Sequence, residues 1–214
     1  MMNNFYVSPE QLIKDKAEFA KKGIEKGRTT ICCETKDGIL FVADNPSKYL
    51  FKTSEIYDRI GFAGAGKYSE FENLRVTGIR HADMKGYSYS RNDVIGRDIA
   101  NLYSQALGHV FNNELKPYEV EVVVAEISEN NEQHLFHIGY DGTLTDKGIA
   151  CAIGGKSDEL NEKINKLYKK KLDRLDALNL MKEFLSNESL KKILNFEVSV
   201  LENKGDNRYF QRIS

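Results

Sequence analysis

The sequence has no tryptophan, only three prolines and three cysteines, and no apolar run near the roughly 20 residues that a membrane-spanning helix needs. The cysteines, Cys32, Cys33 and Cys151, form no C-x-x-C pair, and a sparse, odd count is typical of a reducing compartment. Cys32 and Cys33 should point to opposite faces of a strand, which makes them poor disulfide partners. The N-terminus lacks the regions of a signal peptide. We expect a cytoplasmic protein.

An excess of charge of one sign is also missing, because 31 lysines and arginines accompany 32 aspartates and glutamates. This balance gives no basic field for nucleic acid and no polybasic tail for a membrane surface. Hydrophobic residues make up 41% of the chain, and 214 residues are enough to bury a core. We expect a single domain over residues 1–214 that binds neither nucleic acid nor membrane.

A helix with an encoded start opens the patterned part of the chain. Ser8 can cap this helix, Pro9 suits its first position, and Gln11 completes a capping box. Apolar residues then recur at helical spacing. We place this N-terminal helix over residues 8–26. Residues 1–7 carry neither a helical nor a strand pattern, so we expect them to be a mobile tail.

Strands and helices follow in groups. Two strands, Thr29–Thr35 and Ile39–Ala43, are joined by the turn signal Lys-Asp-Gly, and KYLF, residues 48–51, is a candidate short strand. A strand in EIYDRIGFAGAG, residues 55–66, ends at glycines. Two helices, further strands, two more helices and a final hairpin complete the chain.

The four later helices are each marked by an apolar face. These faces are Phe71, Leu74, Gly78 and Ala82; Ile95, Ile99, Leu102, Ala106 and Val110; Leu160, Ile164 and Leu167; and Leu175, Leu178, Met181 and Leu185. Strands in hairpins predict antiparallel sheets, and each pair of helices needs a sheet face to cover. We therefore predict an α+β fold, a four-layer sandwich with two mostly antiparallel sheets between helical layers, plus the N-terminal helix.

The stretch GFAGAGKY, Gly61–Tyr68, imitates a phosphate-binding loop between a strand and a helix. Tyr68 stands where such a loop has the hydroxyl residue that holds Mg²⁺, and such a loop belongs to a parallel sheet. We interpret the glycines as small residues that let a strand turn tightly into a helix. Nucleotide binding at this stretch is a minor alternative.

No set of residues forms a recognisable metal site or catalytic triad. His134 and His137 are three apart in an expected strand, and therefore on opposite faces, without a cysteine or carboxylate arranged beside them as ligands. Thr29 or Thr30 would be a nucleophile only as residue one, because the free α-amine serves as the base. Since 28 residues that look structured precede Thr29, we interpret both as strand residues. We expect no metal and no cofactor.

Six segments spread over nearly the whole chain carry a resemblance to a known family. They are SPEQ at Ser8–Gln11, KKGIEKGR at Lys21–Arg28, LFVADNPS at Leu40–Ser47, SEIYDRIGFAGAGKYSEFENLR at Ser54–Arg75, GYSYSRNDVIGRDIANLYSQ at Gly86–Gln105 and KPYEVEVVVAE at Lys116–Glu126. Together they are specific, and the chain resembles proteasome α subunits of the bacterial, actinobacterial type. The resemblance implies the helix-coated sandwich of N-terminal-nucleophile hydrolases, in agreement with the element order.

The resemblance also implies that the chain is not an enzyme. In catalytic β relatives a propeptide is cut after a glycine, and the threonine that follows becomes the nucleophile. Gly27 matches this glycine, Arg28 holds the place of the threonine, and Asp44 and Lys52 match the catalytic acid and lysine. Arginine can neither attack a peptide nor promote self-cleavage. The alternative is a threonine peptidase processed before Thr29 or Thr30.

Gating of substrate entry is a second implication of the resemblance. Such α subunits form a homo-heptameric ring at each end of a barrel of β subunits, through which unfolded protein substrates enter. The residues that would form the gate are Met1, Met2, Asn3, Asn4, Phe5, Tyr6, Val7 and Pro9. Archaeal and eukaryotic relatives carry a Tyr-Asp-Arg cluster before this proline, where the present chain reads NFYV. The contacts of that cluster are therefore not carried over.

Docking of an activator is a third implication, and it falls on Lys52. In the family the matching lysine lies in a pocket between neighbouring subunits. There it pairs with the C-terminal carboxylate of an ATPase or other activator whose penultimate residue is tyrosine. Such a charge-assisted hydrogen bond is stronger in a partly closed site than an exposed ion pair. A scaffold of the same fold without β partners is the remaining alternative.

Overall fold

The computed structural model describes most of the chain, namely residues 8–155, 157–188, 195–203, 205 and 209–213. The expected tail, residues 1–7, lies outside the described residues.

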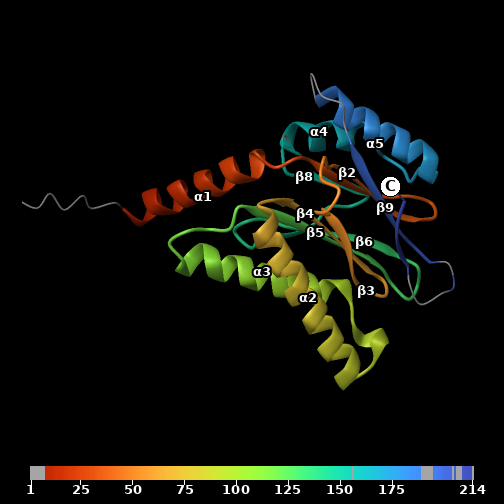
Figure 1. Ribbon diagram of the computed structural model, residues 1–214, viewed down its shortest axis with the longest axis horizontal. Helices are drawn as coiled ribbons and strands as arrows, with labels where there is room; N and C mark the ends of the chain where they lie inside the picture. The colour runs from red at the N-terminus through yellow and green to blue at the C-terminus, as the bar shows by residue number, and fades with distance from the viewer. Residues whose placement is uncertain (1–7, 156, 189–194, 204, 206–208, 214) are drawn as a thin grey trace, which may run out of the picture.

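Two five-stranded sheets lie face to face between two helical layers (Figure 1). The strands are β1 (Thr30–Glu34), β2 (Gly38–Asp44), β3 (Thr53–Tyr57), β4 (Ile60–Gly66), β5 (Val120–Ile127), β6 (Gln133–Ile138), β7 (Leu144–Asp146), β8 (Ala150–Ile153), β9 (Phe196–Glu202) and β10 (Phe210–Arg212). The helices are α1 (Pro9–Glu25), α2 (Tyr68–Ser88), α3 (Gly96–Asn113), α4 (Ser157–Leu167) and α5 (Arg174–Glu188), with the 3-10 helix η1 (Arg91–Asp93).

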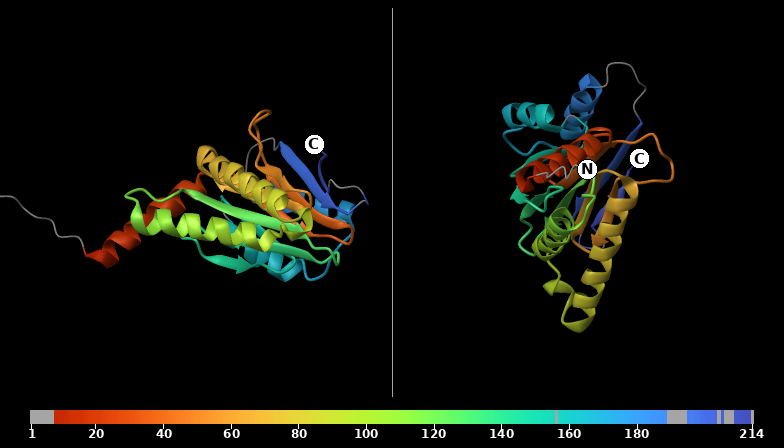
Figure 2. Two further views of the ribbon diagram at one scale, coloured as in Figure 1. Left: turned by 90° about the horizontal axis from the view of Figure 1, so that it is seen from below. Right: turned by 90° about the vertical axis from the view of Figure 1, so that its left-hand side faces the viewer.

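The first sheet has the strand order β10-β9-β2-β1-β8 and the second the order β3-β4-β5-β6-β7. All pairings between these strands are antiparallel. Helices α4 and α5 cover the outer face of the first sheet, and α2 and α3 cover that of the second (Figures 1 and 2). The predicted four-layer α+β sandwich is confirmed.

Successive side chains of a strand point to opposite faces of its sheet, so they pack into different layers of the core. Leu40 and Phe41 are consecutive in β2, yet Leu40 packs toward α5 and Phe41 packs between the sheets. Cys32 and Cys33 are separated in the same way, as predicted. Burial raises the pKa of the Cys33 thiol to about 12, so this thiol stays protonated and unreactive at neutral pH.

Helix α1 starts where the sequence predicts it. Ser8 is the N-cap, and its hydroxyl oxygen accepts a hydrogen bond of 3.2 Å from the backbone N–H of Gln11. Only Ala20 and Ile24 of this helix are fully buried. The N-terminal half of α1 therefore projects away from the sandwich, as Figure 1 and the left view of Figure 2 show.

The predicted strand at residues 48–51 is wrong, because side chains just before this segment bind its backbone groups, which a sheet would otherwise use. Asn45 donates to the carbonyl of Leu50 at 2.7 Å, and Ser47 accepts from the N–H groups of Tyr49 and Leu50. Such local hydrogen bonds compete with the backbone hydrogen bonds that would join this segment to a neighbouring strand. The segment predicted as one strand at residues 55–66 is instead part of the β3–β4 hairpin.

The predicted buried face of α3 is partly wrong. Ile99 is buried as expected, but Ile95 is the N-cap residue and is 39% exposed. The largest buried side chain of this helix is Tyr103, which packs edge-on against Phe62 at a centroid distance of 5.9 Å. The phenol ring needs the close approach of Gly78 in α2, where a Cβ atom would lie 1.9 Å from its hydroxyl oxygen.

Glycines in GFAGAGKY are required by packing. Gly61 and Gly64 lie within β4, and Cβ atoms there would come within 2.8 Å of Phe41 and 2.7 Å of Phe71. Gly66 ends the strand with a φ of +98°, two residues before α2. The interpretation of the glycines as a tight strand-to-helix turn therefore holds for Gly66, whereas Gly61 and Gly64 make room for aromatic rings inside the sandwich.

We expect Gly64→Ala to lower the free energy of unfolding by about 1–3 kcal/mol, because the added methyl group overpacks against the Phe71 ring. The matched control is Gly108→Ala in α3, where the nearest atom to a Cβ would be 3.6 Å away. This control should be neutral or slightly stabilising, because alanine favours helices. Denaturant unfolding of both variants measures the difference. Equal midpoints would contradict the packing argument.

Candidate functional site

Three residues matched to a hydrolase active site lie together where α1 meets the two sheets. Arg28 is in the linker between α1 and β1, Asp44 ends β2, and Lys52 directly precedes β3. Arg28 Nη1 donates to Asp44 Oδ2 at 2.7 Å, and Lys52 Nζ donates to the carbonyl oxygen of Arg28 at 2.6 Å. We call these residues the Arg28–Asp44–Lys52 cluster.

Glu197 in β9 positions the loop that carries Lys52. Its Oε2 accepts from the backbone N–H of Lys52 at 3.0 Å and from the side chain of Asn45 at 2.6 Å. Its Oε1 accepts from the backbone N–H of Thr53 at 2.9 Å and from the Thr53 hydroxyl. Glu197 is 5% exposed, so these donors replace water around the carboxylate.

Glu197 was not among the residues predicted from the sequence. The available signal was a carboxylate between Phe196 and Val198 in a strand rich in apolar residues, because a buried acid needs partners. Nothing local identifies those partners, which lie on a loop far away in the sequence.

Burial lowers the pKa of Lys52 to about 8, and the nearby Arg28 guanidinium acts in the same direction. The carboxylates of Glu197 and Asp44 act in the opposite direction, because they favour the ammonium form. At pH 7 Lys52 is therefore mostly protonated, and it loses its charge within the mildly alkaline range.

The cluster offers cations to a partner and places no hydroxyl for attack. The Arg28 side chain is 34% exposed, whereas that of Asp44 is 14% exposed. Thr30 is fully buried within the first sheet, and the Thr29 hydroxyl donates to the carbonyl of Gly154 at 3.4 Å. The arrangement can bind an anion such as a carboxylate.

Other predicted features are placed as follows. Pro9 is exposed in the first turn of α1, while Met1–Val7 lie outside the described residues. Within the described ranges no group of three histidines, cysteines or acids could hold a metal ion, and no helix has the length and apolarity to cross a bilayer. Burial lowers the pKa of His137 to about 4, so its imidazole is neutral.

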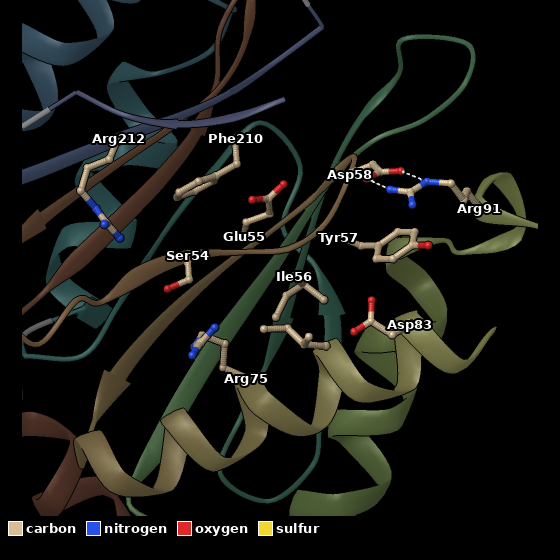
Figure 3. Close-up of a pocket in the computed structure, with 11 residues that line it drawn as sticks. Ser54, Glu55, Ile56, Tyr57, Asp58, Arg75, Asp83, Arg91, Phe210 and Arg212 are labelled. Atoms are coloured by element: carbon tan, nitrogen blue, oxygen red, sulfur yellow. Dashed lines mark hydrogen bonds and ion pairs between the residues drawn. The ribbon is translucent and has the colours of Figure 1, made fainter. Parts of the chain in front are cut away.

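A cavity of about 480 Å³ lies beside the edge of β3, two residues beyond Lys52 (Figure 3). Three arginines and three acids from β3, α2, η1 and β10 line it, so it has no net charge that would select a ligand. Each arginine has a partner: Arg75 binds Glu72, Arg91 binds Asp58, and Arg212 binds the carbonyl of Thr53. Lys52 does not line this cavity.

Comparison with known proteins matches residues 24–201 to the family model described as proteasome subunit. The chain belongs to the proteasome subunit family. The matched region contains the whole Arg28–Asp44–Lys52 cluster and Glu197, and begins after Pro9.

Individual relatives are similar over nearly the whole chain. The chain is 49% identical to the proteasome subunit alpha of Acidimicrobium ferrooxidans, covering 98% of this chain and 91% of the relative. It is 44% identical to the proteasome subunit alpha of Kineococcus radiotolerans, covering 100% and 95%, and 44% identical to that of Thermobifida fusca, covering 98% and 86%. The predicted resemblance to actinobacterial proteasome α subunits is confirmed.

We expect Lys52 to react as a neutral amine with a titration midpoint near pH 8, as measured by competitive acetylation and peptide mass spectrometry. Lys48, exposed in the same loop, is the internal control for the accessibility of the reagent. Asp44→Asn should lower the Lys52 midpoint further, because it removes a favourable negative charge. A Lys52 midpoint at the ordinary lysine value of about 10.4 would contradict the burial argument.

Proposed function

We propose that this protein is the non-catalytic α subunit of a 20S proteasome core in the cytoplasm. Seven copies form the outer ring, which gates the entry of unfolded protein substrates into a chamber of β subunits. The same ring docks an ATPase or another activator. The proposal needs no cofactor.

The observation that carries this proposal is the position of Arg28. Its guanidinium is ion-paired with Asp44 at the place where a catalytic relative has its threonine. A guanidinium stays protonated in proteins and is not a nucleophile. Lys52, which matches the catalytic lysine, donates to the Arg28 carbonyl and has no hydroxyl beside it to activate. The Lys52 ammonium beside Arg28 therefore supports binding of an anion better than peptide hydrolysis.

Docking at Lys52 is supported by the charge of its ammonium group and by the fixed position of its backbone. The ammonium has three N–H donors, one of which is directed to the Arg28 carbonyl, so it can also bind a carboxylate. Glu197 fixes the backbone of Lys52 and Thr53, which reduces the entropy lost on binding. In the proposed ring a neighbouring copy completes the pocket around the activator tail.

Gating is assigned to residues 1–7 and Pro9. Residue 8, which precedes α1, lies at the end of that helix that projects from the sandwich (Figure 1), and the tail directly precedes it in the sequence. Seven such tails around one axis would meet and obstruct the entrance. Asn3 and Asn4 can form hydrogen bonds there, and Phe5 and Tyr6 can form aromatic contacts.

Lys52→Ala should abolish stimulation of the α–β complex by an activator that docks through its C-terminal carboxylate, because the ion pair is lost. Native mass spectrometry should still show the assembled complex. Lys48→Ala, which removes an exposed lysine from the same loop, should respond to the activator like the wild type. A Lys52→Ala complex that binds the activator tail with unchanged affinity would rule out this docking site.

Deletion of residues 1–7 should raise the rate at which the α–β complex cleaves a small fluorogenic peptide without activator. The physical reason is that the deletion removes the obstruction at the entrance while leaving the β active sites intact. The wild-type complex at equal active-site concentration is the comparison. Equal rates would show that this tail does not limit entry.

A further inference from the structure

Positive charge gathers where α4 leads into α5. The segment KINKLYKKK, residues 163–171, contains five lysines and no acidic residue, although the formal net charge of the whole chain is -1. It covers the end of α4 and most of the connector to α5. Such a local excess of one sign attracts groups of the opposite charge even when the protein as a whole is nearly neutral.

Three of the five lysines have no partner among the described residues. Lys166, Lys169 and Lys170 are exposed, and no ion pair or hydrogen bond ties their ammonium groups to the ranges that the structure describes. Lys171 differs, because its ammonium forms an ion pair of 2.7 Å with the buried Glu34. The charge available to a partner therefore comes mainly from Lys166, Lys169 and Lys170.

An exposed leucine lies among these three lysines. Leu167 is the last residue of α4, and 65% of it is exposed to solvent. An apolar side chain surrounded by charged ones matches the usual arrangement of a protein interface, in which apolar contacts lie inside a polar rim. We call Lys166, Leu167, Lys169 and Lys170 the lysine patch.

The connector that carries the lysine patch is fixed to the β1–β2 turn at both of its ends. The Tyr168 hydroxyl donates to the carbonyl of Glu34 at 2.6 Å, and the N–H of Lys36 donates to the carbonyl of Leu172 at 3.0 Å. The patch is therefore presented from backbone of fixed position. A surface held in this way loses less conformational entropy when a partner binds.

The lysine patch lies apart from the Arg28–Asp44–Lys52 cluster. Strand β1 begins at Thr30, two residues after Arg28, and ends at Glu34, whose carbonyl binds Tyr168. At a rise of about 3.3 Å per residue, roughly 13 Å of strand separates the two ends. A partner at the patch can therefore bind without occupying the site at Lys52.

The chemistry of the patch fits an acidic protein segment better than a nucleic acid. Tyr168 is the one aromatic residue of the segment 163–171, and it is buried with its hydroxyl bound to Glu34, so the segment offers no ring for a base to stack on. Leu167 instead suits a partner that carries apolar side chains beside its carboxylates.

We propose that the lysine patch binds an acidic segment of a partner protein. Carboxylates of the partner pair with Lys166, Lys169 and Lys170, and an apolar side chain of the partner packs on Leu167. The inference goes beyond the proposed function, and it depends neither on docking at Lys52 nor on ring formation.

The test measures binding of a labelled acidic peptide to the full-length protein by fluorescence anisotropy. The probe is a short peptide that repeats Glu-Glu-Leu-Glu and has an amidated C-terminus, so that it offers no terminal carboxylate to Lys52. The same peptide with glutamine in place of glutamate should not bind. Affinity for the acidic peptide should fall with rising salt, because exposed ion pairs are screened.

We expect the triple variant Lys166→Gln/Lys169→Gln/Lys170→Gln to bind the acidic peptide about tenfold more weakly, because each exposed ion pair contributes roughly a factor of two to three. Leu167→Ser should weaken binding by about twofold or more, because the apolar contact is lost. All four side chains are exposed, so the unfolding midpoints should stay at the wild-type value.

The matched control is the triple variant Lys14→Gln/Lys26→Gln/Lys48→Gln, which removes the same charge from lysines exposed elsewhere. It should bind the acidic peptide like the wild type, and so should Lys52→Ala. Equal affinity of the two triple variants would overturn the proposal, because binding would then not depend on the patch. Loss of binding in Lys52→Ala would place the peptide at the Lys52 site and would reject the patch while leaving docking at Lys52 intact.

Two further probes test other kinds of partner. Duplex DNA and vesicles that contain phosphatidylserine carry negative charge without acidic protein side chains. Both should bind the full-length protein more weakly than the acidic peptide does. If either binds more tightly, and loses this binding in the lysine-patch triple variant, the patch serves that class of polyanion and the acidic protein segment is rejected.

Discussion

The carboxylate of Glu197 holds the two sheets together at the end of the sandwich that carries the site. It is almost fully buried on β9 of the first sheet, and it binds the backbone of Lys52 and Thr53 at the start of the second. An unpaired carboxylate at this depth would be strongly destabilising, so the loop from Asn45 to Thr53 must keep its donors in place. The position of the Lys52 ammonium, and with it the Arg28–Asp44–Lys52 cluster, follows from this one interaction.

The cluster shows how one arrangement of residues serves different chemistry after a single replacement. An acid, a lysine and a hydroxyl on these elements would form a hydrolytic site, but here an arginine follows the first helix and pairs with the acid. Burial lowers the pKa of Lys52 to about 8, but the cluster has no nucleophile for this lysine to activate. Lys52 is therefore a half-buried cation at the surface. Such a group suits recognition of a carboxylate, in line with the proposed docking of an activator tail.

Much of the fold could be predicted because it depends on neighbours in the sequence. The start of α1 at Ser8, the β1–β2 hairpin and the opposite orientations of Cys32 and Cys33 follow from capping, turn chemistry and strand alternation. The site could be predicted only through the family resemblance, which placed Asp44 and Lys52 beside Arg28. Their distances and the part played by Glu197 had no local signal.

The sequence by itself determined most of the element order, the two antiparallel sheets and the presence of an arginine at position 28, because periodicity and residue chemistry are local properties. Tertiary structure decided what depends on distant partners. Residues 48–51 form no strand, since Asn45 binds both the Leu50 carbonyl and Glu197. On α3, Tyr103 is buried and Ile95 is exposed, because Gly78 of α2 has no side chain and so leaves room for the Tyr103 ring. Glu197 and Lys52 are 145 residues apart in the sequence, so their contact forms only once the two sheets have packed.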